Sequence, residues 1–242
     1  MIKPASADSG ALPFPGAAWL YATNNGEAPL IRFAATCLAL SFASACAAQS
    51  PGLDAAARNY PPFVLGANVR PADGSPPYAR ACPPAGSRVE QRGGPAFEYL
   101  GASPANPDLC RIRIGSDTVE AWQAIWLTAW PGAEAARPLL KQVIEGRTGT
   151  VTGLDVRMMP GLQWHDLMRN EGIEDINLLG KTYRAVKISH YREGFDGNTY
   201  RSVSTVWKDV PTGMILYGTY DHIAGRPELD GSLTPTAIIS AR

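Results

Sequence analysis

The sequence predicts a mainly β, β-rich α+β fold, in which an antiparallel curved sheet or half-barrel carries one helix packed on it. Three observations support this class. From residue 87 onward, short runs rich in β-branched and aromatic residues alternate with Gly, Asn and Pro. Residues 194–198 form a turn signal between two long strand-like arms. Only residues 133–145 combine helical periodicity with helix start and stop signals.

Strands are expected wherever these runs fit the period of two. They cover residues 88–92, 96–101, 109–114, 119–129, 150–158, 163–169, 173–178, 183–192, 199–208 and 214–222. The turn at 194–198 contains Gly and Asn, which adopt positive φ readily, and a second turn is expected at 209–213. The last three strands should therefore form an antiparallel meander.

One helix is expected over residues 133–145. Leu139, Leu140, Val143 and Ile144 form a single apolar stripe, which indicates a helix lying on a sheet. Gly146 is a plausible stop, and Pro138 weakens the first turn.

The N-terminal part of the chain has the features of an export signal. The apolar stretch 33–48 is shorter than the roughly 20 residues that cross a bilayer as a helix. Arg32 precedes it, and Ala43-Ser44-Ala45 supplies the small residues of a cleavage site. We therefore divide the chain into a mis-assigned upstream segment (1–29), a signal peptide (30–45), a Pro/Ala-rich tether (46–86) and a single β-rich domain (87–242). A buried core helix is the alternative for the apolar stretch.

Cys46 directly follows the expected cleavage site. This arrangement resembles a bacterial lipobox, in which the cysteine after the cut carries the lipid, although Ala43 stands where Leu is usual. The expected location is the periplasmic side of the cell envelope, anchored to the outer membrane through lipidated Cys46. Ordinary cleavage at the same bond or after Ala47 would instead give a soluble periplasmic protein.

Export divides the four cysteines into two pairs. Cys37 lies in the signal and Cys46 at the cut, so Cys82 and Cys110 remain in the domain, in a compartment that permits oxidation. A Cys82–Cys110 disulfide is the natural inference. No CxxC or HxxxH spacing accompanies them, so we expect no metal site.

Composition and motifs exclude several function classes. The 22 basic and 22 acidic residues cancel, which gives no broad attraction for nucleic acid. The sequence has no GxSxG elbow, phosphate-binding loop or dinucleotide fingerprint. We therefore expect no cofactor and favour a non-enzymatic protein.

Aromatic residues supply the candidate binding site. Trp122, Trp126 and Trp130 are spaced four apart, which places them on one side of either a strand or, approximately, a helix. We favour the strand, because Ile125, Leu127 and Thr128 are mixed among them and Pro131-Gly132 follows. With Tyr183 and Trp207, the three Trp residues are candidates to bind an apolar or amphipathic ligand, such as a lipid. Packing in the core is the commoner role of such side chains.

Histidine and carboxylate residues offer a weaker hypothesis. His165 and His222 each adjoin an aspartate, but neighbours on a strand face opposite sides, so adjacency alone makes no dyad. A hydrolase would need one of these histidines within reach of another carboxylate. The polar stretch 168–175 could hold acid and base groups or form a solvated loop.

Two segments carry a resemblance to a known class. Residues 180–187 (GKTYRAVK) and 206–217 (VWKDVPTGMILY) resemble a pattern of periplasmic half-barrel proteins, including lipoprotein carriers, in which a strand ending in an aromatic and Asp turns through Gly into an apolar strand. The resemblance covers residues 180–223 and implies no binding residue. The whole chain resembles uncharacterised exported proteins and lipoproteins of bacteria. The leading hypothesis is an envelope lipoprotein that binds an apolar ligand, and the alternative is an interaction or scaffold module of the envelope.

Overall fold

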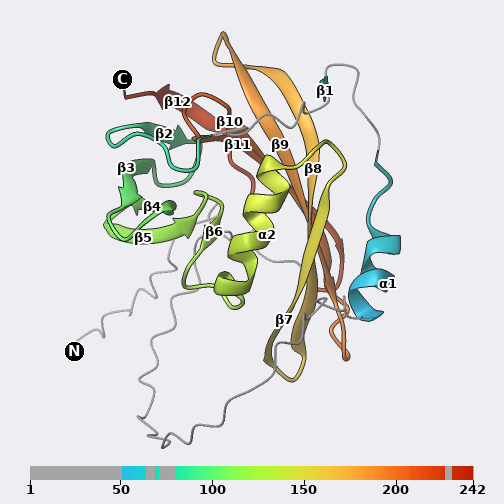
Figure 1. The fold of residues 1–242 in the computed structure, drawn as a ribbon. Coiled ribbons are helices and arrows are strands. Elements are labelled where there is room, and N and C mark those ends of the chain that lie inside the picture. The colour runs from blue at the N-terminus through green and yellow to red at the C-terminus, as the bar shows by residue number, and fades with distance from the viewer. Residues whose placement is uncertain (1–50, 64–68, 71–79, 227–230, 242) are drawn as a thin grey trace, which may run out of the picture.

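In a computed structural model, the described part of the chain contains two open antiparallel sheets and two helices (Figure 1). The structure describes residues 51–63, 69–70, 80–226 and 231–241. The expected signal, its cleavage site and Cys46 lie outside the described residues. The prediction of a mainly β, antiparallel, open architecture is confirmed.

The larger sheet is built from the longest strands of the chain. Its order is β1-β8-β9-β10-β11, and β7 pairs with the first half of β8. The strands are β1 (Val69–Arg70), β7 (Val151–Met159), β8 (Leu162–Leu178), β9 (Lys181–Gly194), β10 (Arg201–Asp209) and β11 (Ile215–Ala224). Strands β9, β10 and β11 form the expected meander. In the turn between β9 and β10, Asp196 and Gly197 have φ angles of 50° and 87°.

The second sheet covers part of the first (Figure 1). Its order is β12-β2-β3-β4-β5-β6. The strands are β2 (Arg88–Gln91), β3 (Phe97–Ser103), β4 (Asn106–Ile114), β5 (Asp117–Trp122), β6 (Trp126–Leu127) and β12 (Pro235–Ile239). Strand β12 was not expected from the sequence. It comes from the C-terminal part of the chain and pairs with the edge of β2.

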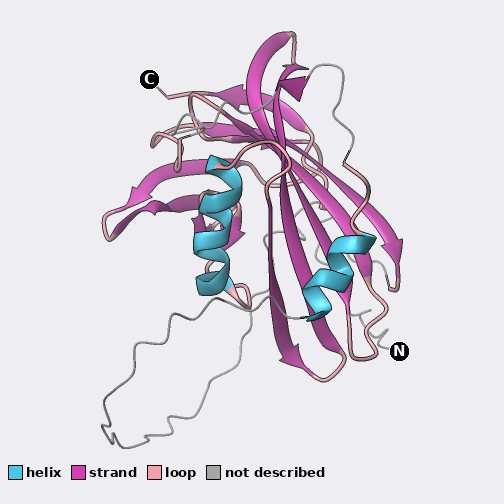
Figure 2. Ribbon diagram, turned by 45° about the vertical axis from the view of Figure 1, so that its right-hand side comes forward, coloured by secondary structure: helices cyan, strands magenta, loops and turns pink. Residues whose placement is uncertain are grey.

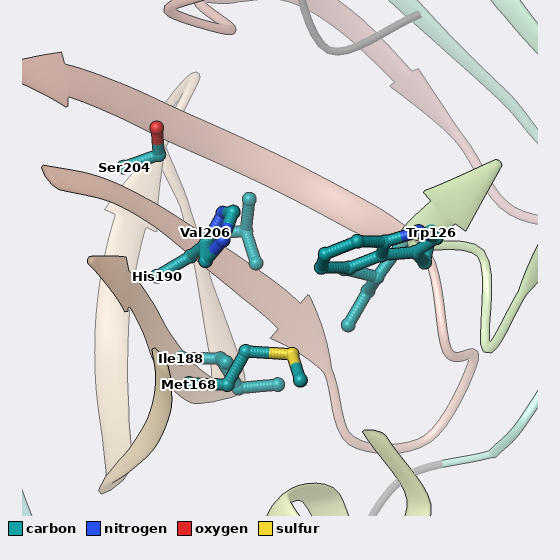
Figure 3. Close-up of a pocket in the computed structure, with 7 residues that line it drawn as sticks. Trp126, Met168, Ile188, His190, Ser204 and Val206 are labelled. Carbon is teal, nitrogen blue, oxygen red and sulfur yellow. The ribbon is translucent and has the colours of Figure 1, made fainter. Parts of the chain in front are cut away.

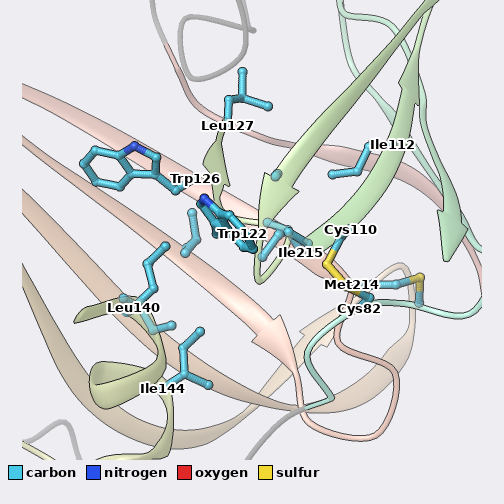
Figure 4. Close-up of a cluster of buried hydrophobic side chains, with 14 of the residues drawn as sticks. Cys82, Cys110, Ile112, Trp122, Trp126, Leu127, Leu140, Ile144, Met214 and Ile215 are labelled. Carbon is cyan, nitrogen blue, oxygen red and sulfur yellow. A yellow bond between two sulfur atoms is a disulfide. The ribbon is translucent and has the colours of Figure 1, made fainter. Parts of the chain in front are cut away.

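The main core lies between the two sheets and includes helix α2. This helix spans Ala133–Glu145, as expected, and buries Leu140, Val143 and Ile144 (Figure 4). Gly132, at the N-cap, has a φ of 75°, and a Cβ there would lie 3.0 Å from Leu154 Cδ1. Glycine therefore allows the helix to approach β7 closely.

A second helix covers the opposite face of the larger sheet (Figure 2). Helix α1 spans Pro51–Asn59, and its Leu53 and Ala56, with the following Tyr60, pack on Leu167 and Tyr191. Part of the expected tether is thus folded onto the domain. The mean composition of 46–86 hid this helix, because its Leu and Ala residues stand among many prolines and glycines.

The polar stretch 168–175 is not a loop. Strand β8 runs through it without a break, with a bulge between Asn170 and Gly172. On the α1 face, Arg169 Nε donates to Glu171 Oε1 at 2.8 Å, and Ser189 donates to the same carboxylate. These buried polar groups also have distant partners, since Ser189 lies on β9 and Arg169 Nη1 donates to Pro61 O at 2.8 Å, and local sequence does not reveal such partners.

The expected disulfide joins Cys82 to Cys110 (Figure 4). Their Cα atoms are 5.2 Å apart, and both side chains belong to the main core. The bond fastens the segment before β2 to strand β4.

Candidate functional site

The strand expected over 119–129 is broken by a tight turn. Ile125 N donates to Trp122 O at 2.9 Å, and the two central residues, Gln123 and Ala124, have φ angles of 55° and 59°. Trp122 on β5 and Trp126 on β6 therefore face each other as paired residues rather than following one another along a strand. The prediction of one continuous strand was wrong because neither central residue is the Gly or Asn that normally marks such a turn.

This turn is held in a costly backbone conformation. A left-handed residue other than glycine costs about 1–2 kcal/mol. The turn is fixed by strand β4, since Gln123 N donates to Asp108 O at 2.8 Å and Gln123 Nε2 donates to Asp108 Oδ1 at 3.0 Å. Backbone strain of this kind is concentrated at binding sites and switch regions.

Trp126, carried by the short strand after the turn, covers a small cavity against the larger sheet. The cavity volume is about 10 Å³, roughly enough for one water molecule. Figure 3 shows the Trp126 ring directed toward His190 and Val206, with Met168 and Ile188 beside them. The lining residues are Ile125, Trp126, Met168, Ile188, His190, Ser204 and Val206. The cavity is thus mainly apolar, with one imidazole and one hydroxyl in its wall.

A buried carboxylate lies behind the imidazole. Asp166 is fully buried and accepts hydrogen bonds from Arg192 Nε at 2.8 Å and Trp164 Nε1 at 3.0 Å. His190 Nε2 lies 2.9 Å from Asp166 Oδ1. Burial raises the pKa of Asp166, but the nearby Arg192 and His190 outweigh it and hold the pKa at about 2. Asp166 is therefore a carboxylate at neutral pH.

The cation beside this carboxylate reaches the edge of the core. Arg192 has 18% of its side chain exposed, and its guanidinium carbon lies 4.6 Å from the centre of the Trp164 ring. Trp126 and His190 have ring centroids 5.4 Å apart. One face of the sheet thus presents an apolar cavity followed by an imidazole and a guanidinium.

A buried lysine holds the turn from the opposite side of the core. Lys208 Nζ donates to Gln123 O at 2.8 Å, Ala81 O at 2.9 Å and Gly213 O at 2.9 Å. The side chain is fully buried, and burial lowers the pKa of Lys208 to about 7, although Asp209 opposes the shift. Three acceptors for three ammonium hydrogens make a complete hydrogen-bond set.

The structure does not bring the five expected aromatic residues together. Trp122 and Trp126 are buried in the main core, and Trp130 packs edge-on against Trp126 at 5.7 Å. Trp207 lies between Val206 and Lys208 on β10. Because side chains alternate along a strand, it points away from the cavity that Val206 lines.

Tyr183 and Trp207 have different partners, and neither lines the cavity, although Tyr183 is buried in the main core. Trp207 Nε1 donates to Glu174, and the Trp207 ring packs against Tyr217 at 5.0 Å. Lys181 Nζ lies 4.9 Å from the centre of the Tyr183 ring. Of the expected set, only Trp126 lines the cavity.

The three histidines lie in separate places. His165 Nδ1 is 2.6 Å from Asp155 Oδ1, and Phe195 stacks on the imidazole at 4.3 Å. His222 is exposed, and its Nε2 lies 3.1 Å from Gly225 O. His165 thus has a carboxylate partner, but Phe195 and helix α1 pack over it and leave little room for a substrate.

Sequence reasoning missed Asp166, His190, Arg192 and Lys208 as a group. The register of the β8–β9 hairpin pairs Asp166 with Arg192 and Met168 with His190. A signal was present, because Asp166 and Met168 share one face by alternation, as do His190 and Arg192. The register across the hairpin was needed to join the two pairs.

The comparisons with known proteins found no match for the chain. No family model matches it, and neither the curated proteins nor the solved structures include a significant match. Within the described residues, no cluster of three His, Cys, Asp or Glu side chains is arranged to hold a metal ion. The helices of that same part of the chain are too short or too polar to span a bilayer.

Proposed function

We propose that the protein is a non-enzymatic lipoprotein of the bacterial cell envelope that binds an amphipathic ligand under Trp126. The observation that carries this proposal is an apolar cavity that Trp126 closes. Trp126 lies on the two-residue strand β6, which directly follows the strained turn at Gln123 and Ala124. The apolar part of the ligand would lie against Met168, Ile188 and Val206. An anionic head group would face His190 and Arg192.

Ligand binding requires the cavity to open. Pockets for small molecules have volumes of roughly 300 Å³ or more, whereas this cavity holds about 10 Å³. Displacement of the Trp126 ring would join the cavity to the edge of the core. The left-handed residues of the preceding turn favour such a change, because leaving this conformation relieves strain.

The remaining features fit an anchored binding protein. Cleavage before Cys46 and lipidation of that residue would place the domain on the periplasmic side of the outer membrane. The Cys82–Cys110 disulfide suits an oxidising compartment. The packed interior around Trp122 also supports the alternative of an interaction module, which would act through its surface and bind no small ligand.

A titration of the full chain with decanoate tests the proposal. Ser204→Phe places a ring in the cavity, and Ile223→Phe adds the same ring at an exposed position of β11. We expect decanoate to bind the wild-type protein and the Ile223→Phe variant equally, and the Ser204→Phe variant at least about tenfold more weakly. Equal binding by all three proteins, or none by any, would contradict a ligand site under Trp126.

A further inference from the structure

The β7–β8 hairpin ends in an apolar tip that projects from the lower end of the larger sheet (Figure 1). Met158, Met159 and Leu162 are 42%, 56% and 43% exposed. Pro160 is exposed as well, and Gly161 has a φ of 81°, which completes a two-residue turn. Single exposed apolar residues are common on protein surfaces, but four in five consecutive positions at a projecting tip form a contact surface.

The start of helix α1 lies at the same end of the molecule as this tip. A Cβ at Gly52 would lie 2.5 Å from His165 Cε1, so the first turn of α1 is packed on the imidazole. His165 is three residues from Leu162 along β8. At the rise of a strand, this separation is about 10 Å.

Chain length then limits the position of the expected anchor. Cys46 is five residues before Pro51 in the sequence. Five residues span at most about 18 Å, even when fully extended. A lipid on Cys46 and the apolar tip are therefore able to meet one flat surface together.

The charged groups next to the tip are one arginine and two aspartates. Arg157 lies 3.8 Å from Asp196 and 4.0 Å from Asp155. This pairing provides no excess positive charge for anionic lipids. Insertion of apolar side chains would therefore dominate any contact with a membrane, and salt would affect it little.

We propose that the tip formed by Met158, Met159, Pro160 and Leu162 inserts into the outer part of a phospholipid bilayer. The proposal rests on the envelope location inferred above. Beside a lipid on Cys46, a second apolar contact with the bilayer would fix the orientation of the domain. The tip would hold the lower end of the larger sheet toward the lipid.

The test uses the full chain with Cys37→Ala and Cys46→Ser, so that one new thiol carries an environment-sensitive fluorophore. The thiol is placed at the tip by Pro160→Cys or, as a control, in the β4–β5 turn by Ser116→Cys. With phosphatidylcholine vesicles that contain spin-labelled acyl chains, we expect a blue shift and quenching at position 160 and neither at 116. The further pair Met159→Ser and Leu162→Ser should weaken this response about tenfold, and the pair Ile223→Ser and Ile239→Ser should not change it.

Three results would overturn the proposal. The first is an unshifted fluorophore at position 160, and the second is equal quenching at positions 160 and 116. The third is a blue shift that grows with protein concentration without vesicles, which would indicate that the tip binds a second copy or another protein. The mass of the mature wild-type N-terminus tests the anchor separately, so failure of the tip and failure of the envelope assignment remain distinguishable.

Discussion

Lys208 Nζ donates to the carbonyl oxygen of Gln123 at 2.8 Å and so joins a strand of the larger sheet to the strained turn of the smaller one. The same ammonium group also bonds the carbonyls beside Cys82 and in the β10–β11 turn. Three loops that are distant in sequence therefore share one buried donor. This contact fixes the turn that precedes Trp126.

Replacement of this lysine should destabilise the fold strongly. Lys208→Met keeps the length of the side chain but leaves three buried carbonyls without their donor, which should lower the free energy of unfolding by about 3–5 kcal/mol. Lys141→Met is the matched control, because Lys141 is half exposed and makes ion pairs at 3.8 Å only. Urea denaturation should show a loss below about 1 kcal/mol for the control. Similar losses in both variants would argue against the role of Lys208.

The buried lysine should also make stability depend on pH. Its pKa is about 7 in the folded protein and near 10.5 in the unfolded chain, so the unfolded state binds more protons between these values. The free energy of unfolding should therefore rise as the pH increases from 7 toward 10.5. The difference between wild type and Lys208→Met should change with pH in this window. A pH-independent difference would show that Lys208 keeps its charge throughout.

Asp166 should contribute the opposite dependence in acid. Its pKa falls from 3.8 to about 2 on folding, so its contribution is present above pH 3.8 and is lost as the pH falls through 2. Asp166→Asn removes this contribution and leaves the Arg192 cation without its buried partner, at a cost of about 3–5 kcal/mol. Acid unfolding followed by circular dichroism should show a weaker dependence on pH in the variant. An unchanged acid profile would contradict this assignment.

The strained turn predicts a stabilising glycine. Ala124 has a φ of 59°, so Ala124→Gly should raise the free energy of unfolding by about 1 kcal/mol. Ala129→Gly, close by in the same connection and outside the residues with positive φ, should lower it. Because the glycine stabilises the closed turn, decanoate should bind the Ala124→Gly variant more weakly. Destabilisation by both glycines would mean that the turn carries no strain.

The disulfide should contribute substantially to stability. The bond closes a loop with a sequence separation of 28, for which the chain-entropy relation gives about 3–4 kcal/mol. The double variant Cys82→Ala and Cys110→Ala should lose this amount in urea denaturation under oxidising conditions. Under reducing conditions, the wild-type protein should approach the variant. A wild-type stability that does not respond to reductant would contradict this expectation.

Local patterns predicted the elements that depend on local sequence. Helix α2 has a complete apolar stripe and a Gly at each end, and the meander has Gly and Asn at its turns. Cys82 and Cys110 were paired by elimination. These features required no knowledge of distant contacts.

The remaining features depend on long-range contacts. The turn at Gln123 and Ala124 lacks turn residues and is imposed by Asp108 and Lys208. Asp166 meets Arg192 only through the register of the β8–β9 hairpin. Side chains alternate along β10, so Val206 faces the cavity under Trp126 and Trp207 faces the other way. The aromatic residues of the sequence therefore did not predict which side chains line the cavity.

Methyl NMR of the methionines tests the central claim most directly, because these residues report on separate places. Met168 lines the cavity (Figure 3), and Met214 is buried in the core near the disulfide (Figure 4). Met158 and Met159 lie at the hairpin tip. On addition of decanoate below its micellar concentration, we expect the methyl signal of Met168 to shift in a saturable manner while that of Met214 stays in place. A titration that leaves Met168 unchanged, or moves only Met158 and Met159, would contradict a ligand site under Trp126.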